Sequence, residues 1–356
     1  MHYKQNLDLH LISFDKDLRF ALHSLNQIKG GHHNQVLFVV NKENQIIGAL
    51  TDGDIRRALI QGSSIDSLVS EIMFVDFRFI FKGDNNIIQL IKDLKRKEIF
   101  ILPILNKKKE LVDIYDLNYF KSMLPMEAVL MAGGEGKRLL PLTESTPKPL
   151  LKVGEKPIIA YNIDRLISYG VKKIHFTLNY LGNQIEDFVN TQNEKRIENN
   201  FVYEKSKLGT AGALALIENF TEDTILVMNS DLLTTIDFEA FYLFFIEQKA
   251  DMAVASVPYT VKIPYAIMEV DKNKVSSFKE KPIFNYYSNA GIYLIKKELL
   301  KLIPENQFFD ATDLMEAVIQ NQLNLVSFPI RHYWLDIGNP NDFERANEDV
   351  KYLNFN

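Results

Sequence analysis

The sequence predicts an α/β protein in two parts: a small α/β module made of two repeats, and a larger domain built on a mostly parallel mixed sheet. Two observations lead to this prediction. Residues 1–124 contain a pattern that recurs after 65 positions, which is typical of two copies of one structural unit. From residue 125 to residue 356, short apolar runs alternate with stretches of helical periodicity, which is typical of a sheet covered by helices.

The composition is that of a globular protein with more than one core. The chain has 356 residues, 46% of them hydrophobic, and chains beyond about 250–300 residues usually divide into domains. Its net charge of −5 gives no general attraction to nucleic acid or acidic membranes. It has no cysteine, no apolar run long enough to span a bilayer and no signal-peptide pattern. We therefore expect a soluble, cytoplasmic protein without a nucleic-acid or membrane partner.

The repeat in the first part is visible as two aligned segments, VLFVVNKENQIIGAL at 36–50 and ILPILNKKKELVDIY at 101–115. Each contains an apolar strand, a polar turn that begins with Asn, and a second apolar strand. Each also lies between two segments of helical periodicity. Because neither copy can bury its own apolar face, the copies, at about 5–62 and 63–124, are expected to pack together.

The repeat resembles the CBS domain, and the pair resembles a Bateman-type module. The segment GALTDGDIRRAL at 48–59 carries the resemblance, which implies an adenine-nucleotide site where Thr51 contacts phosphate and Asp54 contacts ribose hydroxyls. The second copy departs from the pattern at 113, 116 and 119, so one site is expected, in the first copy. Two alternatives remain open: Thr51 or Asp52 caps the following helix, or the module serves only for assembly. CBS pairs stack into dimers, so a homodimer or higher homo-oligomer is expected.

In the second part, strand-like runs alternate with helical segments. The runs AVLMA (128–132), KKIHFTLN (172–179) and TILVMNSD (224–231) alternate with segments such as PIIAYNIDRLISYG (157–170). This order predicts a Rossmann-like sheet of mostly parallel strands with helices on both faces. Ligands of such sheets bind at the carboxyl ends of the strands. The glycine-rich loop after AVLMA and Asp231 are therefore expected at the same edge.

The glycine-rich loop matches neither of two common phosphate-binding loops. A dinucleotide-binding loop needs a third glycine where the chain has Leu139, and a P-loop needs Ser or Thr where it has Arg138. Instead, LMAGGEGKRLLPLTESTPKPLLKVGEKPII at 130–159 resembles the opening motif of the sugar-1-phosphate nucleotidyltransferases. Further motifs of that family follow in order: LGTAGAL at 208–214, MNSD at 228–231, EKP at 280–282, NAGIY at 289–293 and WLDIGNPNDF at 334–343. The resemblance covers about residues 126–350 and implies a GT-A-like fold.

The resemblance also implies a reaction. A nucleoside triphosphate and a sugar-1-phosphate yield a nucleotide sugar and pyrophosphate, with Mg²⁺ as cofactor. The attacking sugar-phosphate oxygen is already anionic, so the reaction needs no general base. It does need backbone N–H donors, cations and a divalent ion, because two polyanions must be brought together and held in line.

Candidates for each of these needs are present. The backbone donors are expected in the glycine-rich loop, at Ala132, Gly133, Gly134 and Gly136. Arg138 is expected beside the pyrophosphate leaving group, Lys148 against a phosphate, and Lys281 on the sugar phosphate. Asp231 and Asp336 are expected to bind Mg²⁺. The resemblance implies further contacts to the nucleotide at Gly209 and Thr210, and to the sugar at Gly212, Glu280, Asn289 and Gly291.

Glu204, in VYEKSKLGTAG, bears on the choice of base. Relatives that read uracil or thymine often carry Gln at the corresponding place. A carboxylate only accepts hydrogen bonds, so it matches the N1–H and N2–H₂ donors of guanine. GTP is therefore the expected triphosphate, the alternative being that Glu204 is a surface residue of a strand.

The combination of a CBS pair with such a transferase resembles the glucosamine-1-phosphate guanylyltransferases of bacterial legionaminic acid synthesis, which serve the production of cell-surface polysaccharide. Mannose- or heptose-1-phosphate guanylyltransferases are near alternatives, and uridylyl- or thymidylyltransferases are more distant ones. An alternative of another class is a catalytically silent nucleotide sensor. The charged residues Arg138, Lys148 and Asp231 argue against a silent sensor, because the transfer chemistry needs such groups.

Overall fold

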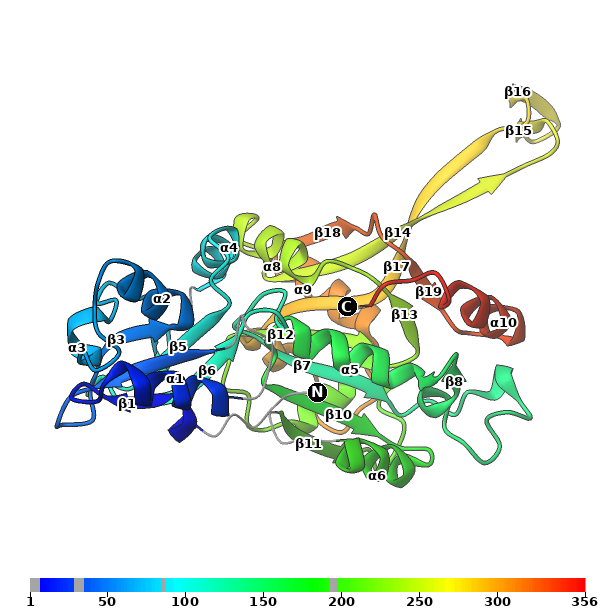
Figure 1. Cartoon of the computed structure of the whole chain (residues 1–356). Helices are drawn as coiled ribbons and strands as arrows, with labels where there is room; N and C mark the ends of the chain where they lie inside the picture. The colour runs from blue at the N-terminus through cyan, green and yellow to red at the C-terminus, as the bar shows by residue number, and fades with distance from the viewer. Residues whose placement is uncertain (1–6, 29–34, 85–86, 193–196, 356) are drawn as a thin grey trace. The chain divides into compact units, whose positions relative to one another are not determined.

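The computed structural model describes residues 7–28, 35–84, 87–192 and 197–355. The chain divides into two compact units, Met1–Met123 and Leu124–Asn356, and Figure 1 shows both. The sequence places the junction one residue later, after 124. Within the described residues, no helix combines the length and apolar composition that a membrane crossing needs.

The first unit contains two three-stranded sheets of the same topology. Their strand orders are β1-β2-β3 and β4-β5-β6; in each sheet the first pair is parallel and the second antiparallel. The strands are β1 (Leu11–Ser13), β2 (Val36–Val40), β3 (Ile46–Thr51), β4 (Ile80–Phe81), β5 (Ile101–Leu105) and β6 (Leu111–Asp116). The helices are η1 (Leu7–His10), α1 (Leu18–Gln27), α2 (Asp52–Ile60), α3 (Val69–Ile72) and α4 (Ile88–Arg96).

The two repeats match in their sheets and hairpin turns and share a core. The helix expected after the second copy, over 117–123, is not formed, whereas α2 follows β3 in the first. Asn41 Oδ1 accepts hydrogen bonds from the backbone of residues 43 and 45, and Asn106 Oδ1 accepts the same bonds in the second hairpin. Each repeat has its own apolar cluster. A third cluster joins them, with members from both sheets: Phe38, Val40, Ile46, Ile101, Leu105 and Ile114. The expected packing of one repeat on the other is therefore present.

The second unit is built on a seven-stranded mixed sheet of order β11-β10-β7-β12-β17-β14-β18. Only β17 runs against the other six, because its pairs with β12 and β14 are antiparallel and the remaining pairs are parallel. The prediction of a mostly parallel sheet is confirmed. The strands are β7 (Glu127–Ala132), β10 (Lys173–Leu178), β11 (Glu198–Tyr203), β12 (Thr224–Asn229), β14 (Met252–Lys262), β17 (Ile283–Lys296) and β18 (Leu325–Pro329).

Helices and short ribbons complete the second unit. One apolar cluster fills the space between the sheet and two of the helices, α7 and α9, with Val129, Val227 and Val254 on the sheet side. The helices are α5 (Ile158–Ser168), α6 (Gly182–Gln192), α7 (Gly209–Gly212), α8 (Phe238–Glu247), α9 (Ala311–Gln320) and α10 (Pro340–Asp349). The 3-10 turns are η3 (Lys137–Leu139), η4 (Lys148–Leu150), η5 (Ala213–Leu216) and η6 (Lys297–Leu302). The short strands are β8 (Lys152–Val153), β9 (Lys156–Pro157), β13 (Leu232–Thr234) and β19 (Trp334–Asp336).

A β-ribbon, residues 257–288, extends beyond the sheet, and we call it the arm (Figure 1). The pairing of β14 with β18 ends at Ser256, whereas β14 and β17 stay paired to Lys262 and Ile283. Two further strands, β15 (Ile267–Asp271) and β16 (Lys274–Lys279), pair at the tip. The outer half of the ribbon therefore pairs only with itself.

A buried polar network ties the start of β7 to its neighbours. Glu127 is 2% exposed and His175 is fully buried; their Oε2 and Nε2 atoms are 2.7 Å apart. The other oxygen of Glu127 accepts from the backbone N–H of Thr221, at 2.7 Å, and from its hydroxyl. Burial alone raises the pKa of Glu127, but the hydrogen bonds from His175 and Thr221 outweigh it and hold this pKa at about 2.

This network predicts a specific acid sensitivity. The folded-state pKa of Glu127 lies below its ordinary value of 4.5, so its stabilisation is present above pH 4.5 and is lost as the pH falls toward 2. A shift of that size corresponds to about 3 kcal/mol. Urea unfolding followed by the fluorescence of Trp334, the one tryptophan, should show this loss, and Glu127→Gln should remove it. The exposed Glu198→Gln is the control. Equal pH slopes for wild type and Glu127→Gln would contradict the assignment.

Candidate active site

The glycine-rich loop leaves the carboxyl end of β7, an inner strand of the sheet that lies between β10 and β12. Gly136 has φ +64° and would bring a Cβ to 2.9 Å from the side chain of Thr143, so glycine is needed there for conformation and for space. A Cβ on Gly134 would meet nothing within 4 Å among the described atoms. The loop thus turns sharply and leaves its backbone accessible at Gly134.

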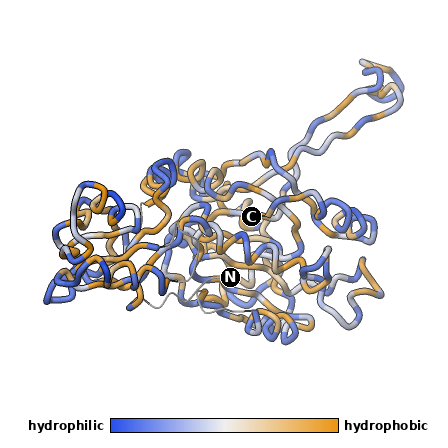
Figure 2. Tube along the Cα trace, viewed as in Figure 1, coloured by the Kyte–Doolittle hydropathy of each residue, from blue (hydrophilic) through white to orange (hydrophobic). Residues whose placement is uncertain are grey.

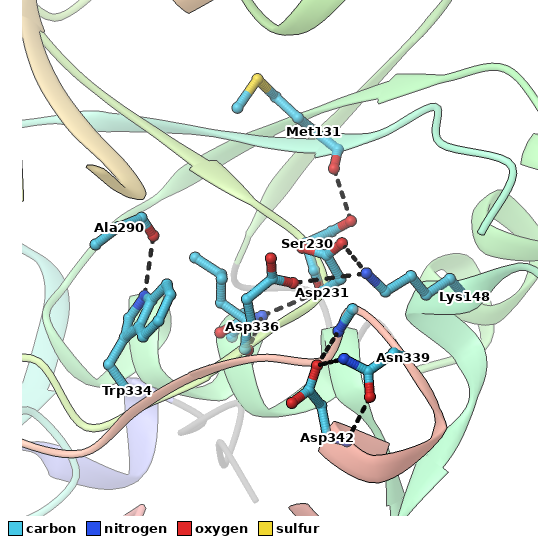
Figure 3. A network of polar contacts seen from close by, with 12 residues as sticks. Met131, Lys148, Ser230, Asp231, Ala290, Trp334, Asp336, Asn339 and Asp342 are labelled. Carbon is cyan, nitrogen blue, oxygen red and sulfur yellow. Dashed lines mark hydrogen bonds and ion pairs between the residues drawn. The ribbon is translucent and has the colours of Figure 1, made fainter. Parts of the chain in front are cut away.

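Three charged side chains meet at this edge: Lys148, Asp231 and Asp336 (Figure 3). Lys148 is only 8% exposed; its ammonium donates to Asp231 Oδ2 and lies 3.7 Å from Asp336 Oδ1. Lys148 begins η4, Asp231 follows β12, and Asp336 ends β19. The structure therefore brings together three residues that the sequence predicts for the site and that lie far apart along the chain.

The two aspartates are held by backbone pairing and by buried polar side chains. Leu232 in β13 pairs with Asp336 in β19, which sets the two carboxylates side by side. Asn162 of α5 is 1% exposed, and its amide donates to the carbonyls of residues 230 and 232, on both sides of Asp231. The hydroxyl of Ser230 donates to the Met131 carbonyl at 2.7 Å. The sequence alone does not assign Asn162 a role at the site, because its one signal is an amide among the apolar positions of a helix.

The site is electrostatically crowded. Burial raises the pKa of Asp336, and the neighbouring charge of Asp231 raises it further, while Lys148 and Arg138 act in the opposite direction. Arg138 is exposed on η3, and its guanidinium lies 3.4 Å from where a Cβ on Gly338 would be. Arg138 is thus the second cation at the carboxylate pair.

The carboxylate pair has oxygens available for a cation. Oδ1 of Asp231 and Oδ1 of Asp336 are buried, and neither has a hydrogen-bond partner among the residues that the structure describes. Within those same residues, no group of three or more histidine or acidic side chains gathers in a geometry for a metal. Two carboxylates with free oxygens suit Mg²⁺, which takes few protein ligands together with water and substrate phosphates.

Glu204, the residue after β11, lies against the glycine-rich loop. Its Oε1 is 2.6 Å from the position that a Cβ on Gly133 would occupy. Its Oε2 accepts from the Leu208 backbone N–H at 3.1 Å. Burial raises the pKa of Glu204, and the Leu208 bond lowers it. The carboxylate is therefore half-buried beside the loop and does not point freely into solvent from a strand.

The LGTAGAL segment forms α7 and packs against residues 307–311. The N–H and hydroxyl of Thr210 both donate to Asp310 Oδ1, and the N–H of Gly212 donates to the Phe309 carbonyl at 2.7 Å. A Cβ on Gly209, whose φ is +76°, would lie 2.8 Å from that carbonyl. These predicted nucleotide and sugar contacts are thus already used in the protein's own packing.

The base of the arm adjoins the site. Gly291 of β17 packs on Asn229, where a Cβ would lie 2.5 Å from the side-chain nitrogen. Asn289 Oδ1 accepts from the Gly291 N–H, and the Trp334 indole donates to the Ala290 carbonyl at 2.9 Å (Figure 3). Asn289 and Gly291 therefore reach the edge that carries Asp231 and Asp336.

Glu280 and Lys281 do not reach the site, contrary to the prediction that both contact the sugar phosphate or the sugar there. They lie between β16 and β17 on the arm, with side chains 64% and 69% exposed. Six residues of extended strand, roughly 20 Å, separate Asn289 from the start of β17 at Ile283. The β14–β17 ladder is continuous over that length, so it carries both residues away from their own chain's carboxylates.

In the first unit, Thr51 and Asp54 lie at the start of α2 and bond to one another. They form a capping box in which Asp54 Oδ2 accepts from the Thr51 N–H and hydroxyl, at 2.8 and 2.6 Å. Arg57 is paired with the other oxygen of Asp54 at 2.5 Å. The helix-capping alternative for these residues therefore describes their contacts in the structure.

The comparisons with known proteins concern the second unit. The nucleotidyl transferase family matches residues 127–352. The catalytic subunit beta of mannose-1-phosphate guanylyltransferase from Xenopus tropicalis is 32% identical over 227 residues, which cover 61% of this chain and 62% of that protein. The mannose-1-phosphate guanyltransferase of Yarrowia lipolytica is 30% identical over 226 residues, with the same coverage. The chain thus spans about three fifths of the length of these curated relatives.

A solved structure agrees with the fold of this unit. A Bacillus anthracis protein assigned as a glucose-1-phosphate thymidylyltransferase is 25% identical with a TM-score of 0.53, covering 65% of this chain and 97% of that one. Because the family match takes in well over half of the residues, this chain belongs to the nucleotidyl transferase family.

Proposed function

We propose that the chain transfers a nucleotidyl group from a nucleoside triphosphate, with GTP preferred, to a sugar-1-phosphate, releasing pyrophosphate. The observation that carries the proposal is the cluster of Lys148, Asp231 and Asp336 beside the accessible glycine-rich loop. Family membership supports the reaction class. An intact cluster of charged groups argues against a silent sensor.

The chain's residues act by position and charge. An oxygen of the sugar phosphate attacks the α-phosphorus, the bond to the β-phosphate oxygen breaks, and pyrophosphate leaves with the electron pair. Backbone N–H groups near Gly134 can approach the triphosphate closely, because no described side chain occupies that space. Arg138 and Lys148 offset the negative charge of the phosphates. No proton has to be removed from the attacking oxygen.

Mg²⁺ is the proposed cofactor, held by Asp231 and Asp336 through the Oδ1 atoms that accept no hydrogen bond from the described residues. When bound, the ion supplies charge neutralisation on the phosphates. In the protein alone, Lys148 neutralises the carboxylate pair, since its ammonium contacts both aspartates.

Guanine is the proposed base because of Glu204. Its half-buried carboxylate faces the loop at Gly133, and it accepts hydrogen bonds but does not donate them, as guanine's N1–H and N2–H₂ edge requires. The guanylyltransferase names of the curated relatives agree with this choice.

Mannose-1-phosphate is the first candidate for the sugar, since both curated relatives carry that substrate in their names. Glucosamine-1-phosphate is the second candidate. It is supported by the resemblance of the whole chain, a CBS-like pair followed by a transferase, to the guanylyltransferases of legionaminic acid synthesis. The first unit is proposed to be a CBS pair that assembles a homo-oligomer and binds one adenine nucleotide at Thr51 and Asp54, where the nucleotide would replace part of the capping box.

The reaction is tested by pyrophosphate release from four nucleoside triphosphates, each paired with mannose-, glucosamine- and glucose-1-phosphate. We expect GTP to be used at least about 10-fold better than UTP or dTTP, which is roughly the effect of one mismatched polar contact. Glu204→Gln adds donors and should move the preference toward UTP and dTTP, whereas Glu198→Gln at the start of β11 should not. Equal use of GTP and UTP by the wild type would contradict the role of Glu204; no release from any pair would contradict the function.

The metal site is tested by binding and by activity together. Asp231→Asn and Asp336→Asn should each abolish Mn²⁺ binding measured by electron paramagnetic resonance, because each removes a carboxylate ligand. Each should also lower kcat by about 100-fold or more. Asp164→Asn, an exposed change on α5, is the control. Tight Mn²⁺ binding by either site variant would remove that residue from the metal site.

The adenine-nucleotide site is tested by thermal shift with AMP and ATP. Ligand should raise the melting temperature of the first unit in the whole chain, by mass action on the folded state. Asp54→Ala should erase the shift. Because this change also breaks the α2 capping box, Asp313→Ala, which breaks the equivalent box of α9, is the matched control and should keep the shift. Calorimetric titration of the wild type without any binding would leave the first unit an assembly module only.

A further inference from the structure

The arm presents an apolar surface that no described residue of its own chain covers. Between residues 259 and 287, nine large apolar side chains are at least 55% exposed, with Tyr265, Phe278 and Tyr287 above 70%. These nine are more than half of all the large apolar side chains that are at least 55% exposed in the part of the chain that the structure describes. Figure 2 shows apolar positions recurring along the whole ribbon.

A ribbon of this kind needs a partner. An isolated two-stranded ribbon is at best marginally stable in water, and large exposed apolar patches mark interaction surfaces. Since one aromatic side chain has roughly 150–250 Å² of surface, the nine side chains present on the order of 1,000 Å² in all. A standard protein interface buries about 800 Å² on each partner. The arm alone is therefore large enough to form one side of a stable interface.

The arm has an excess of positive charge, whereas most cations at the candidate site are paired with carboxylates. The arm carries five lysines and three acidic residues, whereas the whole chain has a net charge of −5. At the site, Lys148 is already matched by Asp231 and Asp336, and Lys137 and Lys207 are both paired with Glu135. A site that must hold two polyanions thus has little unmatched positive charge of its own beyond Arg138, while the arm has lysines in excess.

The arm begins next to the candidate site of its own chain, but its tip lies away from that site. Its base, at Asn289 and Gly291, lies at the edge that carries Asp231. The paired strands then lead the tip away, and folding back would break the continuous β14–β17 ladder. A second copy related by a two-fold axis would receive the arm on the same surface from which its own arm departs, as an isologous contact requires.

We propose that the arm of one chain covers the candidate active site of a second copy of this chain and brings Lys281 to it as a phosphate-binding cation. The complete site is then shared between two copies, each lending its arm to the other. The assignment of a sugar phosphate as the ligand of Lys281 rests on the proposed function. The docking of the arm on a second copy rests on other observations, namely the arm's apolar surface, its charge and the position from which it leaves the sheet.

Docking is tested without any enzyme assay, using the absence of cysteine from the chain. Lys281→Cys provides a single thiol for a benzophenone photo-crosslinker, and labelled chains with normal nitrogen are mixed with unlabelled ¹⁵N chains. Mass spectrometry should find crosslinks from position 281 to ¹⁵N peptides that contain Gly134, Asp231 or Asp336. Crosslinks only within one isotopic form would mean that the arm folds onto its own chain and would overturn the proposal, as would no crosslink to these peptides. Crosslinks from Lys274→Cys, elsewhere on the arm, map the rest of the contact.

The shared site is tested by mixing two variants that are each defective. Lys281→Ala and Asp231→Asn, with different affinity tags, should each lower turnover by about 100-fold or more. In an isolated mixed dimer, the chain with intact Asp231 receives the partner's intact Lys281, so about half of the wild-type activity per dimer should return. If the arm acted within its own chain, the mixed dimer would stay as inactive as the variants. Lys301→Ala, an exposed change on η6 outside the arm, is the control and should keep wild-type activity.

The two tests separate the proposal from the function on which part of it rests. Wild-type chains that crosslink between copies but release no pyrophosphate would refute the transferase and leave docking established. Active wild-type chains whose mixed dimer shows no recovery would refute the shared site and leave the transferase established.

Discussion

The ion cluster of Lys148, Asp231 and Asp336 is the interaction on which the candidate site depends. Two carboxylates set side by side in a half-buried place repel one another, which together with burial raises the pKa of Asp336. The ammonium of Lys148, itself nearly buried, offsets that repulsion. An uncompensated buried charge is costly, so the segments that supply these side chains must come together. The β13–β19 pairing and the amide of Asn162 hold them there.

Much of this arrangement follows from the sequence. The alternation of strands and helices predicts the parallel sheet, and the rule that ligands bind at the carboxyl ends of strands places the glycine-rich loop near Asp231. Asn162 was not predictable in its role, because the pattern of α5 shows only that an amide lies among apolar positions. Its hydrogen bonds to both neighbours of Asp231 depend on how the helix is set against β13, which is tertiary information.

For two other groups of residues, the sequence motif alone does not predict where the side chains lie in the structure. The LGTAGAL glycines and Thr210 are explained by packing against residues 307–311, 100 residues away, and spacing alone does not reveal such a partner. Lys281 lies in a motif of the expected order, yet motif order does not tell in which direction a ribbon leaves the sheet. The length of the β14–β17 ladder decides that, and it takes Lys281 away from its own carboxylates.

The central claim is that Asp231 and Asp336 form a metal-ion site. In the protein alone, the ammonium of Lys148 takes the place of the ion beside these two carboxylates. This claim is tested most directly by crystals soaked with Mn²⁺ and a non-hydrolysable GTP analogue, measured at the manganese absorption edge. We expect one anomalous peak within coordination distance of both carboxylates, with the Lys148 ammonium withdrawn from Asp231 toward a phosphate. A manganese peak bound elsewhere, with the contact between Lys148 and Asp231 unchanged, would contradict the account.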